Sequence, residues 1–164
     1  MSKETQKRIQ SDLKAMQDSA YRDFHSKLVP NIDKETIIGV RMPMLRAYAK
    51  RLCKEEPETA KAFMQIAPHN FYEENNLHGL LISNLAKSAE EALNAVDAFL
   101  PCVDNWATCD LLPPKIFKKN LQAVRQRPRH PRQVPPTERT SAGLCFPCFK
   151  AFCSHYGTTA VRTG

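Results

Sequence analysis

The chain has 164 residues, enough for one domain whose core needs neither disulfides nor metals. It contains no run of about eighteen apolar residues, and its charged start leads into no signal peptide, so we expect a soluble cytoplasmic protein that makes no contact with a membrane. The formal net charge of +7 invites comparison with nucleic-acid-binding proteins, so its distribution along the chain matters.

Basic and acidic residues are almost balanced over most of the sequence. Up to Leu121 there are seventeen Lys and Arg against sixteen Asp and Glu, whereas from Gln122 onward there are seven against one. The basic character therefore belongs to the C-terminal segment, and it is no evidence about the rest of the chain.

Apolar residues recur every three or four positions from about residue 3 to residue 28, which predicts one long amphipathic helix. Its inward positions are Ile9, Leu13, Met16, Ala20, Phe24 and Leu28. A connector follows, and then two Pro-initiated helices, about 43–54 and 57–66, form a helical hairpin.

A second pair of helices is predicted over about 72–86 and 89–100. Ser88 with Glu91 three residues later is a capping-box pattern, and a further helix restarts at 113–121. No segment reads as a convincing strand, so the fold class is all-α. Helix pairs recurring at roughly thirty to forty residues are typical of a HEAT or armadillo superhelix of antiparallel pairs.

The segment 103–110 contains the only tryptophan, Trp106, and places Asp110 four residues after it. On a helix both side chains share one face, one turn apart. An indole beside a carboxylate makes a surface that suits a cationic ligand or transition state. Asp104 is a candidate helix cap. The alternative is that Trp106 anchors a core and Asp110 is an ordinary solvated acid.

Three segments, in their order and spacing, resemble the DNA alkylation repair enzyme family. They are 39–50 (GVRMPMLRAYAK), 73–80 (EENNLHGL) and 103–110 (VDNWATCD). The resemblance covers roughly residues 1–121. It implies a HEAT-like repeat fold whose concave face takes double-stranded DNA with alkylated bases, and a glycosylase that excises cationic purines such as 3-methyladenine and 7-methylguanine without any cofactor.

By the same resemblance Trp106 and Asp110 match the catalytic tryptophan and aspartate of the family. We leave His78 out of the site, because a histidine before glycine on an apolar helix is more often a packed residue. The residues expected to contact the DNA backbone are Arg41, Arg46, Lys50, Lys115, Lys118 and Lys119. For each of these the alternative is an ordinary solvated side chain.

The sequence changes character after residue 121, which divides it into a helical domain, 1–121, and a basic tail, 122–164. The tail is rich in Pro and Arg, and it stands where the family continues with helices that supply a catalytic arginine and a second tryptophan. It is either a disordered extension that binds nucleic acid or an out-of-frame product, and the abrupt change favours the second. A solenoid that ended here would expose an apolar edge for a partner protein, so a non-catalytic DNA- or protein-binding fragment is the alternative function.

The cysteines give no firm sign of a metal site. Cys53, Cys102 and Cys109 lie in helical patterns and are expected to be reduced thiols. Four potential zinc ligands fall in the tail, at Cys145, Cys148, Cys153 and His155. The single CxxC lacks the second half that makes such patterns specific, so we predict no metal site.

Overall fold

A computed structural model describes residues 2–112 and 115–120, and within these residues the chain is helical with no strand. The α-helices are α1 Ser2–Ala15, α2 Ser19–His25, α3 Met42–Glu55, α4 Pro57–Met64, α5 Tyr72–Leu85, α6 Ala89–Phe99, α7 Trp106–Leu111 and α8 Lys115–Lys119. Two single-turn 3₁₀ helices precede α3 and α7, at Lys34–Thr36 and Leu100–Cys102. The all-α prediction is confirmed.

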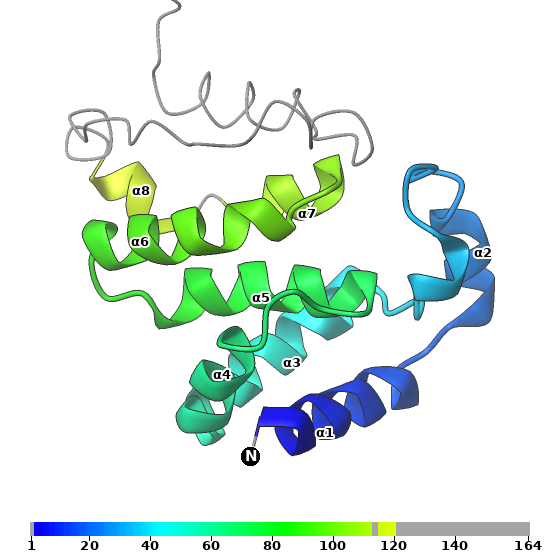
Figure 1. Cartoon of the computed structure of the whole chain (residues 1–164), viewed down its shortest axis with the longest axis horizontal. Coiled ribbons are helices and arrows are strands. Elements are labelled where there is room, and N and C mark those ends of the chain that lie inside the picture. Colours follow the sequence, from blue (N-terminus) through cyan, green and yellow to red (C-terminus); the bar gives the residue numbers. More distant parts are fainter. Residues whose placement is uncertain (1, 113–114, 121–164) are drawn as a thin grey trace, which may run out of the picture.

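Helix α5 is the centre of the fold. It packs against α3 and α4 on one side and against α6 and α7 on the other (Figure 1). Leu77 and Leu81 of α5 are buried in a core shared with α1, α3 and α4, while Ile82 belongs to a second core shared with α6, α7 and α8. Helix α5 therefore fixes the positions of α3 and α7, and of the side chains on them, relative to each other.

Both predicted helix pairs are present, as α3 with α4 and α5 with α6. Pro43 and Pro57 lie in the first turns of α3 and α4, where a missing N–H costs nothing. Ser88 caps α6 by accepting from the N–H of Glu91, but the Glu91 carboxylate accepts from the N–H of Lys87. In the predicted capping box Glu91 would accept from the N–H of Ser88, and in the structure it accepts from the residue before, Lys87. The superhelical stacking of pairs stays a prediction.

The single helix predicted over 3–28 is wrong. Helix α1 ends at Ala15 and α2 begins at Ser19, because Asp18 leaves the helical path: its N–H donates to the carbonyl of Gly39 over 3.0 Å and its carboxylate caps α2. Gly39 has φ +95°, and a Cβ there would lie 2.6 Å from the Asp18 carbonyl oxygen. A close backbone contact with a residue distant in sequence thus interrupts a continuous apolar pattern.

The break changes the surroundings of the second half of that pattern. Ile9 and Leu13 are buried as predicted, whereas Phe24 and Leu28 are exposed and do not face the core. Beyond α2 the chain returns inward at Val29, which packs with Ile37 and Tyr72 in a small third cluster. This cluster holds the segment between α2 and α3 against α5 and α7.

Within residues 2–112 and 115–120, no helix combines the length and the apolar character needed to cross a bilayer. Cys53, Cys102 and Cys109 are free thiols, as predicted. The tail from residue 122 and its four potential zinc ligands lie outside the described residues, and the cytoplasmic location stays a prediction.

Candidate functional site

Helix α7, which carries the predicted catalytic pair, begins with an asparagine cap. The side-chain oxygen of Asn105 accepts from the N–H of Thr108 over 2.8 Å. The prediction that Asp104 caps this helix is wrong: its carboxylate accepts instead from the side-chain amide of Asn105 over 2.8 Å. Asn105 occupies the N-cap position, from which a side chain reaches the N–H of the third residue of the helix. The Asp104 carboxylate orients the Asn105 side chain by accepting from its amide.

A chain of buried hydrogen bonds fastens α7 to α5. The amide of Asn105 donates to the hydroxyl oxygen of Thr108 over 3.0 Å, and that hydroxyl donates to the side-chain oxygen of Asn76 over 2.7 Å. Gly79, one turn further along α5, stands opposite Leu111 and Leu112 with no side chain to hold them away. The α5 segment that resembles the family is thus the support of α7.

With its inner face fastened in this way, α7 turns Trp106 and Asp110 outward. Both are exposed, and they lie one turn apart as predicted. The indole N–H of Trp106 donates to the carbonyl of Leu28 over 3.3 Å, which ties the ring to the turn after α2. Among the residues that the structure describes, none forms an ion pair or hydrogen bond with the Asp110 carboxylate.

Between the two lies Cys109, whose side chain points into the core. Burial, and then the charge of Asp110, raise the pKa of its thiol to about 11. The thiol therefore stays protonated near neutral pH and is not the nucleophile of this site. Asp110 is the ionisable side chain that α7 presents to solvent.

A buried carboxylate, that of Glu73, fixes the segment before α3. Glu73 accepts from the backbone N–H groups of Ile38, Gly39 and Val40, at 2.8, 2.7 and 3.2 Å. Burial raises the pKa of Glu73, while the three N–H donors favour its charged form. These three hydrogen bonds fix the backbone that leads to Arg41 and the start of α3.

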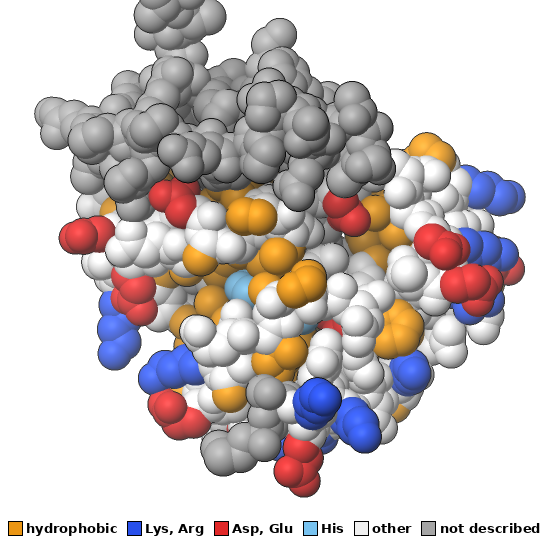
Figure 2. Space-filling model, viewed as in Figure 1, with side chains coloured by type: hydrophobic (Ala, Val, Ile, Leu, Met, Phe, Trp, Pro, Cys, Tyr) orange, Lys and Arg blue, Asp and Glu red, His pale blue; other side chains and the backbone are white. Residues whose placement is uncertain are grey.

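The predicted DNA-contact residues are distributed over three parts of the fold. Arg41 donates to the Asp18 carboxylate over 2.8 Å and lies over the Tyr21 ring. Arg46 and Lys50 are exposed on α3, and Lys115 is exposed on α8. Lys118 and Lys119 belong to α8, but their side chains lie outside the described residues. On the face drawn in Figure 2, basic side chains are interspersed with acidic ones.

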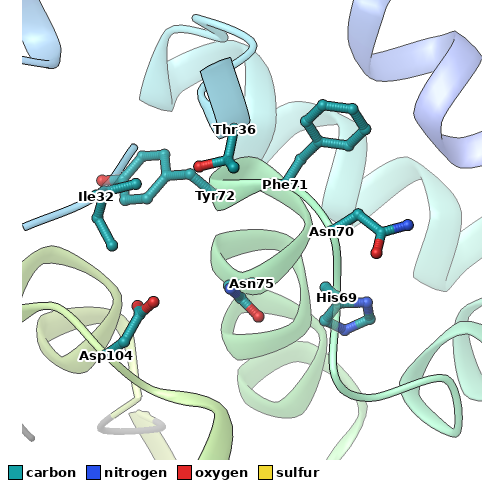
Figure 3. A pocket seen from close by; sticks show the side chains of 8 residues that line it. All are labelled: Ile32, Thr36, His69, Asn70, Phe71, Tyr72, Asn75 and Asp104. Carbon is teal, nitrogen blue, oxygen red and sulfur yellow. The ribbon is translucent and has the colours of Figure 1, made fainter. Parts of the chain in front are cut away.

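A pocket of about 190 Å³ opens where the segment between α2 and α3 meets the start of α5. Its walls are Ile32, Thr36, His69, Asn70, Phe71, Tyr72, Asn75 and Asp104. In Figure 3, Asn75 stands in the middle of this wall, between Tyr72 and His69. Neither Trp106 nor Asp110 lines the pocket, so it is separate from the predicted catalytic pair.

The histidines beside the pocket are structural. A ring nitrogen of His69 lies 2.9 Å from one of His78, and the two rings stack on Phe63 and Phe99 respectively. Burial lowers the pKa of His69 to about 4 and that of His78 to about 3. Both are neutral near pH 7, and the interpretation of His78 as a packed residue is confirmed by its burial.

Within the described part of the chain, no three His, Cys, Asp or Glu side chains gather in a way that would hold a metal ion.

The residues that hold α7 in place were not predicted from the sequence. Asn76 and Thr108 carry no sign of their pairing in a single sequence, and the Leu28 carbonyl has no side-chain signature at all. Asn105 was recognisable as an alternative cap, since Asn and Asp are equally favoured there.

Comparison with known proteins gives one result. The family model described as DNA alkylation repair enzyme matches residues 9–133, which is most of the chain. No curated protein and no solved structure matches it significantly. The matched region includes all three segments on which the resemblance rests, and it extends beyond residue 121, so the boundary between domain and tail stays a prediction.

Proposed function

Since the chain belongs to the DNA alkylation repair enzyme family, and so has a role in DNA repair with DNA as its partner, we propose that it is a DNA glycosylase for cationic alkylated purines. It would hydrolyse the N-glycosidic bond of bases such as 3-methyladenine and 7-methylguanine. The observation that carries this proposal is the exposed pair of Trp106 and Asp110 on a helix whose inner face is fastened to α5.

Excision of a cationic purine does not require a general acid in the site. An N-alkylated purine already carries a positive charge, so it leaves without protonation, and positive charge develops on the deoxyribose as the bond breaks. The Asp110 carboxylate would stabilise that charge or orient the attacking water. Fixed groups of this kind contribute about 3 kcal/mol to transition-state stabilisation. The exposed position of Asp110 supports this role.

Trp106 would supply the second half of the site. Its indole face attracts a cationic sugar and displaces water from one side of it. The hydrogen bond to the Leu28 carbonyl restricts the rotation of the ring, so the aromatic face is held in place before DNA arrives. Trp106→Phe keeps the aromatic face and should retain more activity than Trp106→Ala.

Contacts with the DNA backbone would come from Arg46, Lys50 and Lys115, which are exposed on α3 and α8, and from Lys118 and Lys119. Arg41 would be a weaker contact, because it is already engaged by Asp18. Each phosphate contact should add about 0.9 to the slope of log affinity against log salt. Five such contacts, from Arg46, Lys50, Lys115, Lys118 and Lys119, would therefore give a total slope of about 4.5.

The test is release of base from a duplex that carries 7-methylguanine, measured under single-turnover conditions with the full chain. Asp110→Asn should lower the rate by about a hundredfold or more. Asp104→Asn is the matched control, since it changes an exposed carboxylate six residues earlier and keeps an oxygen that can accept from Asn105. The control should release base at the unmodified rate.

Equal rates for Asp110→Asn and the unmodified chain would refute the catalytic assignment. A folded chain that binds the duplex without releasing base would instead be the alternative, a helical module that binds DNA without catalysis.

A further inference from the structure

Three large hydrophobic side chains are exposed at or near the candidate site. Trp106 is 47% exposed, Leu28 45% and Phe24 60%. Phe24 and Leu28 are four residues apart, and the helical hydrogen bonds of α2 continue as a turn from Lys27 to Phe24 and from Leu28 to His25. The indole N–H of Trp106 donates to the carbonyl of Leu28. We call Phe24, Leu28 and Trp106 the apolar strip.

The segment that carries the apolar strip is held in place by contacts with the rest of the fold. The α2 cap at Asp18 and the buried cluster of Val29, Ile37 and Tyr72 hold the segment that carries it from both ends. Asn31 adds a hydrogen bond of 2.8 Å to the carbonyl of Asp104, just before α7. Neighbouring exposed hydrophobic side chains on a segment held at both ends are typical of a surface that contacts another molecule.

We propose that Phe24 and Leu28 extend the DNA-contact surface of Trp106 and pack against the deoxyribose rings that line the minor groove beside the damaged nucleotide. The inference rests on the proposed function, in which Trp106 faces the deoxyribose of that nucleotide. Leu28, whose carbonyl accepts from the indole, and Phe24, one turn before it, would then meet the neighbouring sugars. Proteins that bind the minor groove frequently insert apolar side chains such as Phe and Leu into it, so the groove accepts side chains of this kind.

Charge and size both favour DNA over a second copy of the chain as the occupant. Lys27 is exposed and stands between Phe24 and Leu28 in sequence, where it would meet a phosphate at the edge of the groove. A stable dimer buries about 800 Å² on each partner. Three side chains, each about half exposed, give a patch well below that area.

The experiment measures binding of the full chain to a dye-labelled duplex carrying 7-methylguanine, over a series of salt concentrations. The combined Phe24→Ala and Leu28→Ala variant should bind on the order of tenfold more weakly at every salt concentration, because an apolar contact is lost while the number of phosphate contacts is kept. Lys27→Gln should instead reduce the salt slope by about 0.9. Met44→Ala is the matched control, since Met44 is 45% exposed on α3.

Circular dichroism of each variant checks that the fold is intact, and the substitutions are at the surface. A double variant that is folded and binds DNA as tightly as the unmodified chain and Met44→Ala overturns the inference. If the unmodified chain still releases base in that case, the proposed function stands alone; a chain that neither binds nor releases base overturns both. Self-association that disappears in the double variant, with DNA affinity unchanged, also overturns the inference in favour of a second copy.

Discussion

The hydroxyl of Thr108 donates to the side-chain oxygen of Asn76 over 2.7 Å, and this bond joins the helix that carries Trp106 and Asp110 to the central helix α5. Both residues are buried, and Thr108 also accepts from the capping residue Asn105. The position of the candidate site therefore depends on a short polar network inside an otherwise apolar interface. Such networks are costly to break, since each abandoned group stays away from water.

Thr108→Val should destabilise the chain by about 1–3 kcal/mol, because it keeps the shape of the side chain but removes the hydroxyl that donates to the buried oxygen of Asn76. The amide of Asn105 loses one of its two acceptors and keeps the Asp104 carboxylate. Urea unfolding measures the change. Thr59→Val is the control: its hydroxyl bonds Glu56 at the surface, so it should change stability by no more than about 0.5 kcal/mol. Equal effects of the two substitutions would mean that the buried network contributes nothing to stability.

Glu73→Gln should cost about 2–3 kcal/mol, because an amide has one accepting oxygen where the carboxylate serves three backbone N–H groups. The loss should be accompanied by faster hydrogen exchange at Ile38, Gly39 and Val40. Glu35→Gln changes an exposed carboxylate and should do neither. Protection that is unchanged at residues 38–40 in the Gln variant would contradict this role of Glu73.

The two glycines of the matched segments should respond differently to alanine. Gly39→Ala places a Cβ 2.6 Å from the Asp18 carbonyl oxygen at φ +95°, and should cost about 2 kcal/mol or more. Gly79→Ala meets Leu112 at an ordinary contact distance of 3.4 Å and gains helix propensity, so it should stay within about 1 kcal/mol of the unmodified chain. The midpoints of thermal unfolding of the two variants give the comparison, and the reverse order would refute it.

Stability should fall as the pH drops from about 6.5 towards 4. In the unfolded chain His69 and His78 titrate near the ordinary value of 6.5, whereas burial lowers their pKa to about 4 and about 3 in the folded chain. The unfolded state therefore takes up protons first, and each proton shifts the equilibrium towards unfolding. Urea unfolding at pH 7, 6, 5 and 4 measures the slope.

The control for that slope is the double variant in which His69 and His78 both become Leu. It should lose much of the dependence on pH between 6.5 and 4, because no buried neutral imidazole remains at this position to be protonated on unfolding. An identical slope in the two proteins would assign the acid sensitivity to other groups.

Local patterns were sufficient to predict the middle of the fold. The spacing of apolar residues, with Pro43, Pro57 and Ser88 at helix starts, predicted the pairs α3–α4 and α5–α6, since each signal acts within one or two turns. The break between α1 and α2 was not predictable in this way. Its cause is the contact of Asp18 with Gly39, which lies on the other side of α2 in sequence.

Part of the candidate site was likewise predictable from local sequence, and part of it was not. The one-turn separation of Trp106 and Asp110 follows from helix geometry and was predicted, and the exposed position of both agrees with it. The support beneath them was not, because Asn76 is thirty-two residues from Thr108 and the partner of the indole is a backbone carbonyl. Their roles as catalytic residues stay predictions until base release is measured.

Trp106, whose indole N–H donates to the Leu28 carbonyl, makes the candidate site visible to fluorescence spectroscopy. Trp106 is the one tryptophan in the sequence, so light absorbed beyond the tyrosine band is emitted from the candidate site alone. Emission from a half-exposed indole responds to the polarity around it and to stacking partners. Titration with unlabelled DNA should therefore change the colour or the yield of this emission, and the Phe24 and Leu28 substitutions can be followed at the same ring without attaching a dye.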